Sequence, residues 1–268
     1  MPRRHPWWRC AARKAQLNAS PILATRDLGL DIGGATILSE VGLEVRAGEL
    51  LAVIGPNGAG KTTLFNLVSG LLRPTSGRIE LEGADITEKP PSLRTRAGLG
   101  RTFQVSNVFP LLPALENVRL AAEAALGGTM RIWRRARHVR EAVDRAAWAL
   151  GRVGLGDREA VSAGLLSHGD KRKLELAMLL AGTPRVLLLD EPMAGVSVED
   201  VPELVELIRS VHAEEGKTVL MVEHHMEVVT GLAERIAVMH HGRLLAVDTP
   251  DAIMRNATVQ QAYLGEPL

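Results

Sequence analysis

A glycine-rich stretch in the first quarter of the chain determines its architecture: Gly55-Pro56-Asn57-Gly58-Ala59-Gly60-Lys61-Thr62-Thr63. An apolar run at residues 50–54 precedes it, and residues 63–68, with helix-like composition, follow it. A glycine-rich loop between a strand and a helix is the context of a phosphate-binding loop, because glycines let several backbone N–H groups turn toward one anion. The positive end of the helix dipole adds to that attraction. The sequence therefore predicts a phosphate-binding loop in an α/β protein.

Two side chains of this loop are predicted to act directly on a bound nucleotide. Lys61 would reach the β- and γ-phosphates, and the hydroxyl of Thr62 would bind Mg²⁺. The rest of the loop would surround the phosphates with its backbone. The residues expected to do so are Gly55, Pro56, Asn57, Gly58, Ala59, Gly60 and Thr63.

The composition limits the kinds of molecule that the chain can be. Its 268 residues are 46% hydrophobic, enough to bury a large core. No stretch approaches the roughly 20 apolar residues of a membrane span, so a soluble globular protein is expected. A net charge of +1, from 32 basic and 31 acidic residues, and a 3% aromatic content argue against nucleic acid as the main ligand. The single cysteine, Cys10, excludes an intrachain disulfide and fits a reducing cytoplasm.

The first twenty residues differ from the rest of the chain. They are basic and broken by proline, and they lack the apolar centre of a secretory signal. We predict a disordered basic tail at residues 1–20 and one domain at residues 21–268. Contact of Trp7, Trp8 and the arginines with a membrane surface is one alternative, and a translation start assigned too far upstream is another.

A second apolar run ends at two adjacent acids: Val186-Leu187-Leu188-Leu189-Asp190-Glu191-Pro192. A strand that is apolar on both faces belongs inside a parallel sheet, so these acids should lie at the carboxyl edge, where α/β proteins bind ligands. Short strands with turns at residues 33–34 and 47–48, and another strand at 78–81, predict an antiparallel sheet beside this core. Apolar residues at helical spacing between 113 and 155 predict helices, among them Val139, Val143, Ala146, Leu150 and Val153.

Three further motifs complete an ordered set. They are Arg101-Thr102-Phe103-Gln104, Leu166-Ser167-His168-Gly169-Asp170 and, after a strand at 218–222, Glu223-His224-His225. From the residues alone, Ser167 and Asp170 indicate a helix N-cap with a capping-box partner. In this order, the motifs resemble those of ATP-binding subunits of ABC transporters, over about residues 22–266. The resemblance implies an α/β P-loop NTPase of ABC type, with a mainly parallel core sheet, an antiparallel β subdomain and a helical subdomain at about residues 105–165.

The resemblance also implies a metal site and a set of catalytic residues. Asp190, with Thr62 and Gln104, would bind Mg²⁺. Glu191 would orient the attacking water, since phosphoryl transfer depends mainly on positioning and charge stabilisation. Gln104 would also contact that water, and His224 would contact the γ-phosphate. With Lys61, these side chains form the expected catalytic set.

A second group of residues is expected to bind ATP from outside the phosphate loop. Ser167 and Gly169 would clamp the γ-phosphate held by a second subunit, because a helix N-terminus attracts anions. Ile32 occupies the position where many relatives stack an aromatic residue on adenine, which predicts weaker base discrimination. Ser197, where the family often has Asp, puts communication between the subunits in question. His168 and Asp170 also depart from the commonest form, which has Gly and Gln.

Smaller features indicate a branch of the family. Residues 168–173, Ala194-Gly195, Val222-Glu223-His224 and residues 262–266 resemble ATP-binding subunits of branched-chain amino-acid importers. The related urea and amide importers look similar. The implied protein is an ATPase that uses ATP and Mg²⁺ on the cytoplasmic face of the membrane. Its implied partners are two multi-spanning permeases, a second ABC ATPase chain, identical or different, and a separate solute-binding protein.

Two functions from other classes remain open at this stage. One is a soluble ABC ATPase that acts on ribosomes or DNA, against which the near-neutral charge and the single nucleotide unit argue. The other is a regulatory module that binds ATP without hydrolysing it, for which Ser197 and Ile32 are the only support. Negligible hydrolysis in the presence of the permeases would favour the second.

Overall fold

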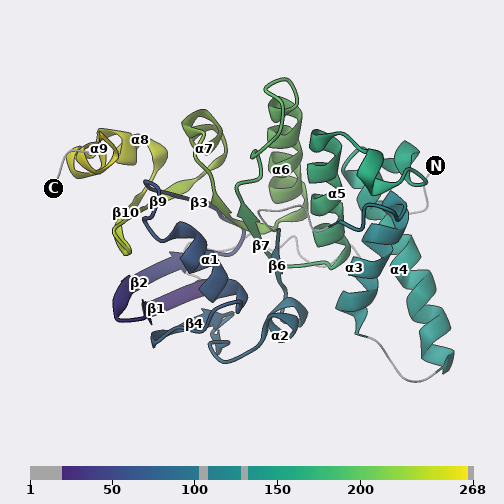
Figure 1. Ribbon diagram of the computed structural model, residues 1–268, viewed down its shortest axis with the longest axis horizontal. Coiled ribbons are helices and arrows are strands. Elements are labelled where there is room, and N and C mark those ends of the chain that lie inside the picture. Colours follow the sequence, from purple (N-terminus) through teal and green to yellow (C-terminus); the bar gives the residue numbers. More distant parts are fainter. Residues whose placement is uncertain (1–19, 103–107, 128–131, 265–268) are drawn as a thin grey trace.

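The computed structural model describes residues 20–102, 108–127 and 132–264, so the predicted tail lies almost wholly outside it. Figure 1 shows a part built on two sheets and, beside it, a group of helices that includes α3, α4 and α5. The strands are β1 (Leu23–Ile32), β2 (Ala35–Val45), β3 (Leu50–Ile54), β4 (Ser76–Leu81), β5 (Ala84–Asp85), β6 (Leu99–Arg101), β7 (Val186–Asp190), β8 (Thr218–Val222), β9 (Arg235–His240) and β10 (Arg243–Asp248). The helices are α1 (Lys61–Ser69), α2 (Pro91–Arg96), α3 (Ala114–Leu126), α4 (Ile132–Arg152), α5 (His168–Ala181), α6 (Val201–Glu215), α7 (Met226–Leu232), α8 (Pro250–Arg255) and α9 (Ala257–Leu264).

The larger sheet brings three chain segments to one edge. Its strand order is β10-β9-β3-β8-β7-β6, and all neighbours are parallel except β10. Every residue of β3, β7 and β8 is buried, as expected for strands covered on both faces. The predicted bounds of these three strands are confirmed. Because they run parallel, the segments that follow them emerge at the same edge: the phosphate loop, Glu191, and Glu223 with His224.

The smaller sheet is antiparallel, as predicted, with the order β2-β1-β4-β5. Helix α1 packs between the two sheets (Figure 1), and its residues Leu64, Phe65, Leu67 and Val68 are completely buried among apolar side chains from both. The start of α1 therefore has a fixed position relative to both sheets.

Helices α3, α4 and α5 pack against one another mainly through small side chains. The buried face of α4 is lined by Ala142, Ala146, Ala149 and Leu150. The helix predicted from the spacing that includes Val139 is present, and Val139 itself is 36% exposed. The alanines let the helices approach closely, and of the three only Ala146 was among the residues whose spacing predicted the helix. Within the described ranges, no helix has both the length and the apolar character needed to cross a bilayer.

Candidate functional site

The phosphate loop is a tight turn that depends on glycine. A Cβ atom on Gly55 would lie 2.2 Å from the carbonyl oxygen of Met239, and Gly60 caps the N-terminus of α1 with φ 97°. Lys61 is only 6% exposed, and its Nζ donates to the carbonyl oxygens of Gly55 (2.7 Å) and Pro56 (2.9 Å). Thr62 and Thr63 follow in the first turn of α1. The loop thus presents helix N–H groups and one ammonium group to the same place, which suits a phosphate chain.

The charge of Lys61 responds to the acids that end β7. Burial lowers the pKa of Lys61, and the charges of Glu191 and Asp190 oppose that shift. The charges of these two carboxylates therefore favour the charged form of Lys61. The phosphate loop and the two acids therefore form one electrostatic unit.

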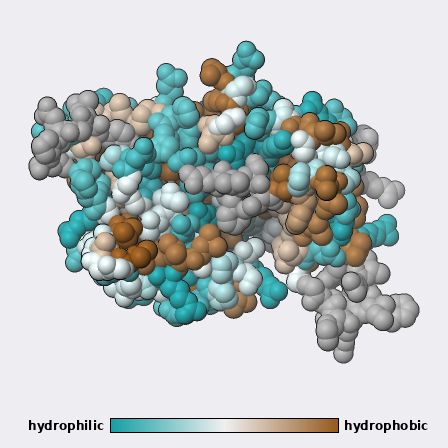
Figure 2. Space-filling view, viewed as in Figure 1, coloured by the Kyte–Doolittle hydropathy of each residue, from teal (hydrophilic) through white to brown (hydrophobic). Residues whose placement is uncertain are grey.

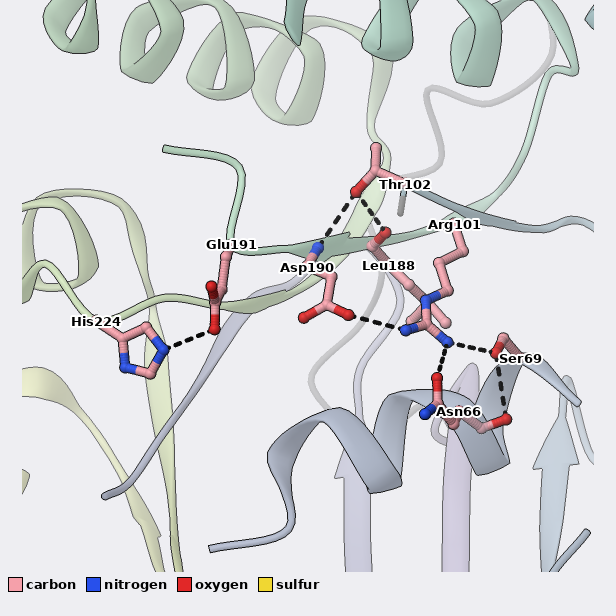
Figure 3. A network of polar contacts seen from close by, with 8 residues as sticks. All are labelled: Asn66, Ser69, Arg101, Thr102, Leu188, Asp190, Glu191 and His224. Atoms are coloured by element: carbon pink, nitrogen blue, oxygen red, sulfur yellow. Dashed lines mark hydrogen bonds and ion pairs between the residues drawn. The ribbon is translucent and has the colours of Figure 1, made fainter. Parts of the chain in front are cut away.

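Asp190 is buried, and its two carboxylate oxygens lie in different environments. Its Oδ2 accepts a hydrogen bond from Nη2 of Arg101 at 2.8 Å, and its backbone N–H donates to Oγ1 of Thr102 at 3.2 Å (Figure 3). Its Oδ1 is buried and has no hydrogen-bond partner among the residues that the structure describes. Mg²⁺ prefers hard oxygen ligands of this kind, so the side chain fits the metal that the sequence implies.

Glu191 has a backbone conformation that is unusual for a residue with a side chain. Its φ is 49°, in the left-handed region, and its N–H donates to the carbonyl oxygen of Val222 at 2.9 Å. Its Oε1 lies 2.7 Å from Nε2 of His224 (Figure 3). Left-handed residues other than glycine cost free energy and gather at functional sites, where the surrounding structure holds them. The strands β7 and β8 thus bring Glu191 and His224 into direct contact.

The motif at Ser167 begins α5, as predicted. Oγ of Ser167 accepts a hydrogen bond from the N–H of Asp170 at 3.0 Å. A Cβ atom on Gly169 would lie 2.9 Å from Oδ2 of Asp200, so a larger residue there would displace the Asp200 carboxylate. Ser167 itself is exposed, and the predicted N-cap is confirmed, while the carboxylate of Asp170 accepts a hydrogen bond from Arg158. This helix N-terminus, like any other, carries a partial positive charge, and it lies in the helical part of the molecule.

Two predicted site residues remain, Ile32 and Gln104. Ile32 ends β1 with its side chain 54% exposed, which leaves it free to contact a ligand. Gln104 lies outside the described residues.

Comparisons with known proteins agree with this geometry. Residues 38–194 match the family model described as ABC transporter, and residues 243–267 match the model described as branched-chain amino acid ATP-binding cassette transporter. The chain is 38% identical over 253 residues to the high-affinity branched-chain amino acid transport ATP-binding protein LivG of Salmonella typhimurium, covering 92% of this chain and 99% of LivG. The chain belongs to the ABC transporter family.

Solved structures place the fold within the same family. The ADP conformation of MJ1267, an ATP-binding cassette of an ABC transporter, superimposes with a TM-score of 0.81 at 28% identity, over 92% of this chain and all of that one. A dimeric post-hydrolysis structure of the ATP-binding cassette MJ0796, bound to ADP and Pi, gives a TM-score of 0.71 at 26% identity, over 85% of this chain and 98% of that one. The predicted fold class and family are therefore confirmed. As an ABC transporter ATP-binding protein of the branched-chain amino acid type, the chain is an ATPase that drives transport.

The structure of this ABC ATPase also shows contacts that the motifs did not predict. Arg101 was noted only as part of the motif around Gln104, yet its guanidinium group joins Asp190 to α1. Nη2 of Arg172 donates to the carbonyl oxygen of Ala194 at 3.0 Å and so joins α5 to the loop after the two acids. Glu223 is 1% exposed and its Oε1 lies 2.7 Å from Nδ1 of His225. A charged residue at the end of an apolar strand is the only sequence signal for Arg101 and Glu223.

Proposed function

We propose that this ABC ATPase powers the uptake of branched-chain or other hydrophobic amino acids. The observation that carries the proposal is the C-terminal match at residues 243–267, which is specific to the branched-chain amino acid type. The similarity to LivG over nearly the whole length of both chains supports it. A urea-like or amide solute is the alternative that an uptake measurement separates.

In the proposed reaction, the residues at the carboxyl edge of the larger sheet have separate roles. Lys61 and the backbone of the phosphate loop bind the β- and γ-phosphates. Thr62, Asp190 and Gln104 would hold Mg²⁺, which would supply positive charge to the phosphate oxygens. Glu191 orients the attacking water, and His224 holds Glu191 while it contacts the γ-phosphate. The 2.7 Å contact between these two side chains supports their acting together.

A second ABC ATPase chain, identical or different, completes the proposed site. Ser167 is exposed at the N-terminus of α5, where it can meet a phosphate that another subunit holds. The similar ATP-binding cassette MJ0796 is dimeric in its post-hydrolysis state with ADP and Pi, which supports a second chain here. ATP would then join two chains, and hydrolysis would release them. A ligand that favours one state in this way shifts the equilibrium between the two states of an attached permease.

The proposed docking site for a permease is a groove of about 300 Å³ between α2, α3 and α5. Its lining is mostly small or apolar and includes Leu71, Pro91, Ala121, Ala125 and Leu179. These side chains leave room for an element of another protein, and Leu71 is 49% exposed. The partners would be two multi-spanning permeases, served by a separate solute-binding protein, with this chain at the cytoplasmic face of the membrane.

Exposed apolar side chains near the helical part support a protein partner. Phe109, Leu111 and Leu165 are 54%, 90% and 82% exposed. The two loops that carry them are joined by a backbone hydrogen bond from Gly164 to Pro110 (2.8 Å). Figure 2 shows apolar surface gathered over the region of α3 and α5. Several large apolar side chains together on a surface are typical of an interaction site.

The proposal is tested by purifying the Glu191→Gln chain from detergent-solubilised membranes of its host in Mg·ATP and identifying the accompanying proteins by mass spectrometry. Recovery of two multi-spanning permeases supports the transporter, whereas ribosomal or DNA-bound material without them contradicts it. Host cells lacking this chain are then assayed for uptake of labelled leucine and of labelled urea. Restoration of leucine uptake by the wild-type chain, and not by Glu191→Gln, is the expected result. Restoration of urea uptake alone would overturn the choice of solute.

A further inference from the structure

Arg101 connects the end of α1 to the acid that ends β7. Its Nη1 donates to Oδ1 of Asn66 (2.8 Å) and to Oγ of Ser69 (2.7 Å), while its Nη2 donates to Oδ2 of Asp190 (2.8 Å). The side chain of Arg101 is 8% exposed and that of Asp190 is completely buried. The guanidinium carbon lies 5.9 Å from the centre of the Phe65 ring, also on α1. Contacts with α1 therefore hold the guanidinium group in place independently of its bond to Asp190.

This arrangement leaves Asp190 one oxygen for another ligand. Figure 3 shows one carboxylate oxygen of Asp190 pointing at Arg101 and the other pointing away from it. The second oxygen, Oδ1, is the buried one that lacks a hydrogen-bond partner within the described part of the chain. A planar guanidinium group that is held in place fixes the plane of the carboxylate it binds, as an ammonium group on a flexible stem does not.

We propose that Arg101 is a positioning residue for the metal site: it holds Oδ2 of Asp190 from behind, so that Oδ1 stays turned toward the metal. The inference rests on the Mg²⁺ role proposed above for Asp190. Groups that hold a metal ligand in this way raise metal affinity, and their loss typically lowers it by about 10- to 100-fold. Arg101 itself need not touch the metal or ATP.

A simpler role for Arg101 would be to neutralise the charge of Asp190. The two roles predict different results for a lysine at this position and opposite results for a glutamine. Arg101→Lys keeps the positive charge and loses the planar fork, so metal affinity falls if orientation matters and stays normal if charge alone matters. Arg101→Gln removes the charge as well, so it tightens metal binding if charge alone matters, because a cation that repels the metal is gone.

Arg94 provides a matched control on the same helix end. It is 1% exposed, and its Nη1 donates to the carbonyl oxygens of Leu67 (2.6 Å) and Val68 (2.7 Å) in the last turn of α1. Its Nε and Nη2 donate to the carbonyl oxygens of Lys89 and Thr87. Arg94→Lys therefore disturbs the end of α1 and leaves the bond between Arg101 and Asp190 in place.

The experiment measures Mn²⁺ affinity in the presence of ATP by electron paramagnetic resonance, with the full chain carrying Glu191→Gln so that ATP persists. Arg101→Lys, Arg101→Gln and Arg94→Lys are compared in that background, with melting temperatures and ATP binding in EDTA as checks on folding. We expect both Arg101 variants to bind Mn²⁺ about tenfold or more weakly. Arg94→Lys should lower the melting temperature with Mn²⁺ affinity within about twofold of the parent.

Each other outcome counts against a defined statement. Normal Mn²⁺ affinity in Arg101→Lys, or tighter binding in Arg101→Gln, overturns the positioning role and leaves the metal site intact. Equal loss in Arg94→Lys assigns the effect to α1 as a whole and also overturns it. If the parent chain binds no Mn²⁺ with ATP, the proposed metal site itself fails. Should Arg101→Gln not fold, Arg101→Lys alone decides the question.

Discussion

Nε2 of His224 lies 2.7 Å from Oε1 of Glu191, although the two residues are separated by 33 positions in the chain. The contact arises because β7 and β8 are parallel neighbours that end at the same edge, with Asp190 opposite Val222. Each residue comes directly or almost directly after its strand, so the register of the sheet sets the distance between them. The pair is therefore held by the backbone before any ligand arrives, which favours catalysis by positioning.

Substitution of Glu191 by Gln should remove hydrolysis and preserve ATP binding. The amide is nearly the same size, but it cannot orient or polarise water as a carboxylate does, so the rate should fall about 100-fold or more. ATP should then trap a dimer, visible by size-exclusion chromatography with Mg·ATP. Glu206→Gln, on the exposed face of α6, is the matched control and should hydrolyse normally. A normal rate in Glu191→Gln would remove Glu191 from its role.

Loss of His224 should act through Glu191. His224→Ala removes the partner that fixes the carboxylate, and misplacement of a reacting group costs up to about 100-fold in rate. In the Glu191→Gln background the same change should lower the residual rate little further, because residues that act as a unit are not additive. Phosphate-release assays on the two single variants and the double variant measure this. His225→Ala is the neighbouring control, and additive losses would show that the two residues act separately.

Two substitutions at Ser167 should separate its capping role from its role toward a second chain. Ser167→Ala removes the bond to the N–H of Asp170 and should lower the free energy of unfolding by about 1 kcal/mol. Ser167→Asp keeps a good N-cap but places a negative charge where a phosphate would bind, so stability should stay while the ATP-dependent dimer is lost. Urea unfolding and chromatography in the Glu191→Gln background test the two effects. A stable dimer of Ser167→Asp would contradict the clamp.

An aromatic side chain at position 32 should tighten nucleotide binding. Ile32 is exposed, so Ile32→Tyr disturbs no core packing. Stacking of a base on an aromatic ring contributes about 1–3 kcal/mol, so ATP affinity should rise about fivefold or more. Calorimetric titration with ATP and with inorganic triphosphate separates base from phosphate contributions, since only ATP should gain. Equal affinities of Ile32→Tyr and wild type for ATP would place the base elsewhere.

Glu223 should make stability depend on pH. Burial raises the pKa of Glu223 above its ordinary 4.5, while the hydrogen bond and charge of His225 oppose the shift. Because the pKa of Glu223 is higher in the folded protein, the unfolded chain loses this proton at a lower pH. The stability that protonated Glu223 contributes is therefore complete below pH 4.5 and is lost as pH rises through the folded pKa. Glu223→Gln mimics the protonated carboxyl. Its melting temperature should therefore exceed that of wild type by more at about pH 8 than at about pH 5. A constant difference, or one no larger than in the exposed Glu227→Gln, would contradict this.

The elements that carry the site could be predicted because their signals are local. The strands at 50–54, 186–190 and 218–222 are continuous apolar runs bounded by glycine or polar residues, so their ends and the residues after them could be placed. The N-cap at Ser167 has the same local character. These segments also hold most of the family's motifs, which is why family and fold were predicted together.

The two arginines that hold α1 could not be predicted in this way. Arg94 lies in a short polar segment that suggests a solvated helix. It is nevertheless buried, because two carbonyl oxygens of α1 and two of the loop before α2 accept its hydrogen bonds. The partner of Arg101 on β7 is 89 positions away. Neither contact leaves a periodic pattern, and both depend on how the two sheets meet around α1.

Helix α1 has nine residues and so is about 13 Å long. Its first turn carries Lys61 and its last turn is gripped by Arg94 and Arg101, both of which also line the groove between α2, α3 and α5. Because α1 is short and is held at both ends, a displacement of its first turn would also move its last turn. A shift of the phosphate loop would then also move Arg94 and Arg101 at the wall of the groove.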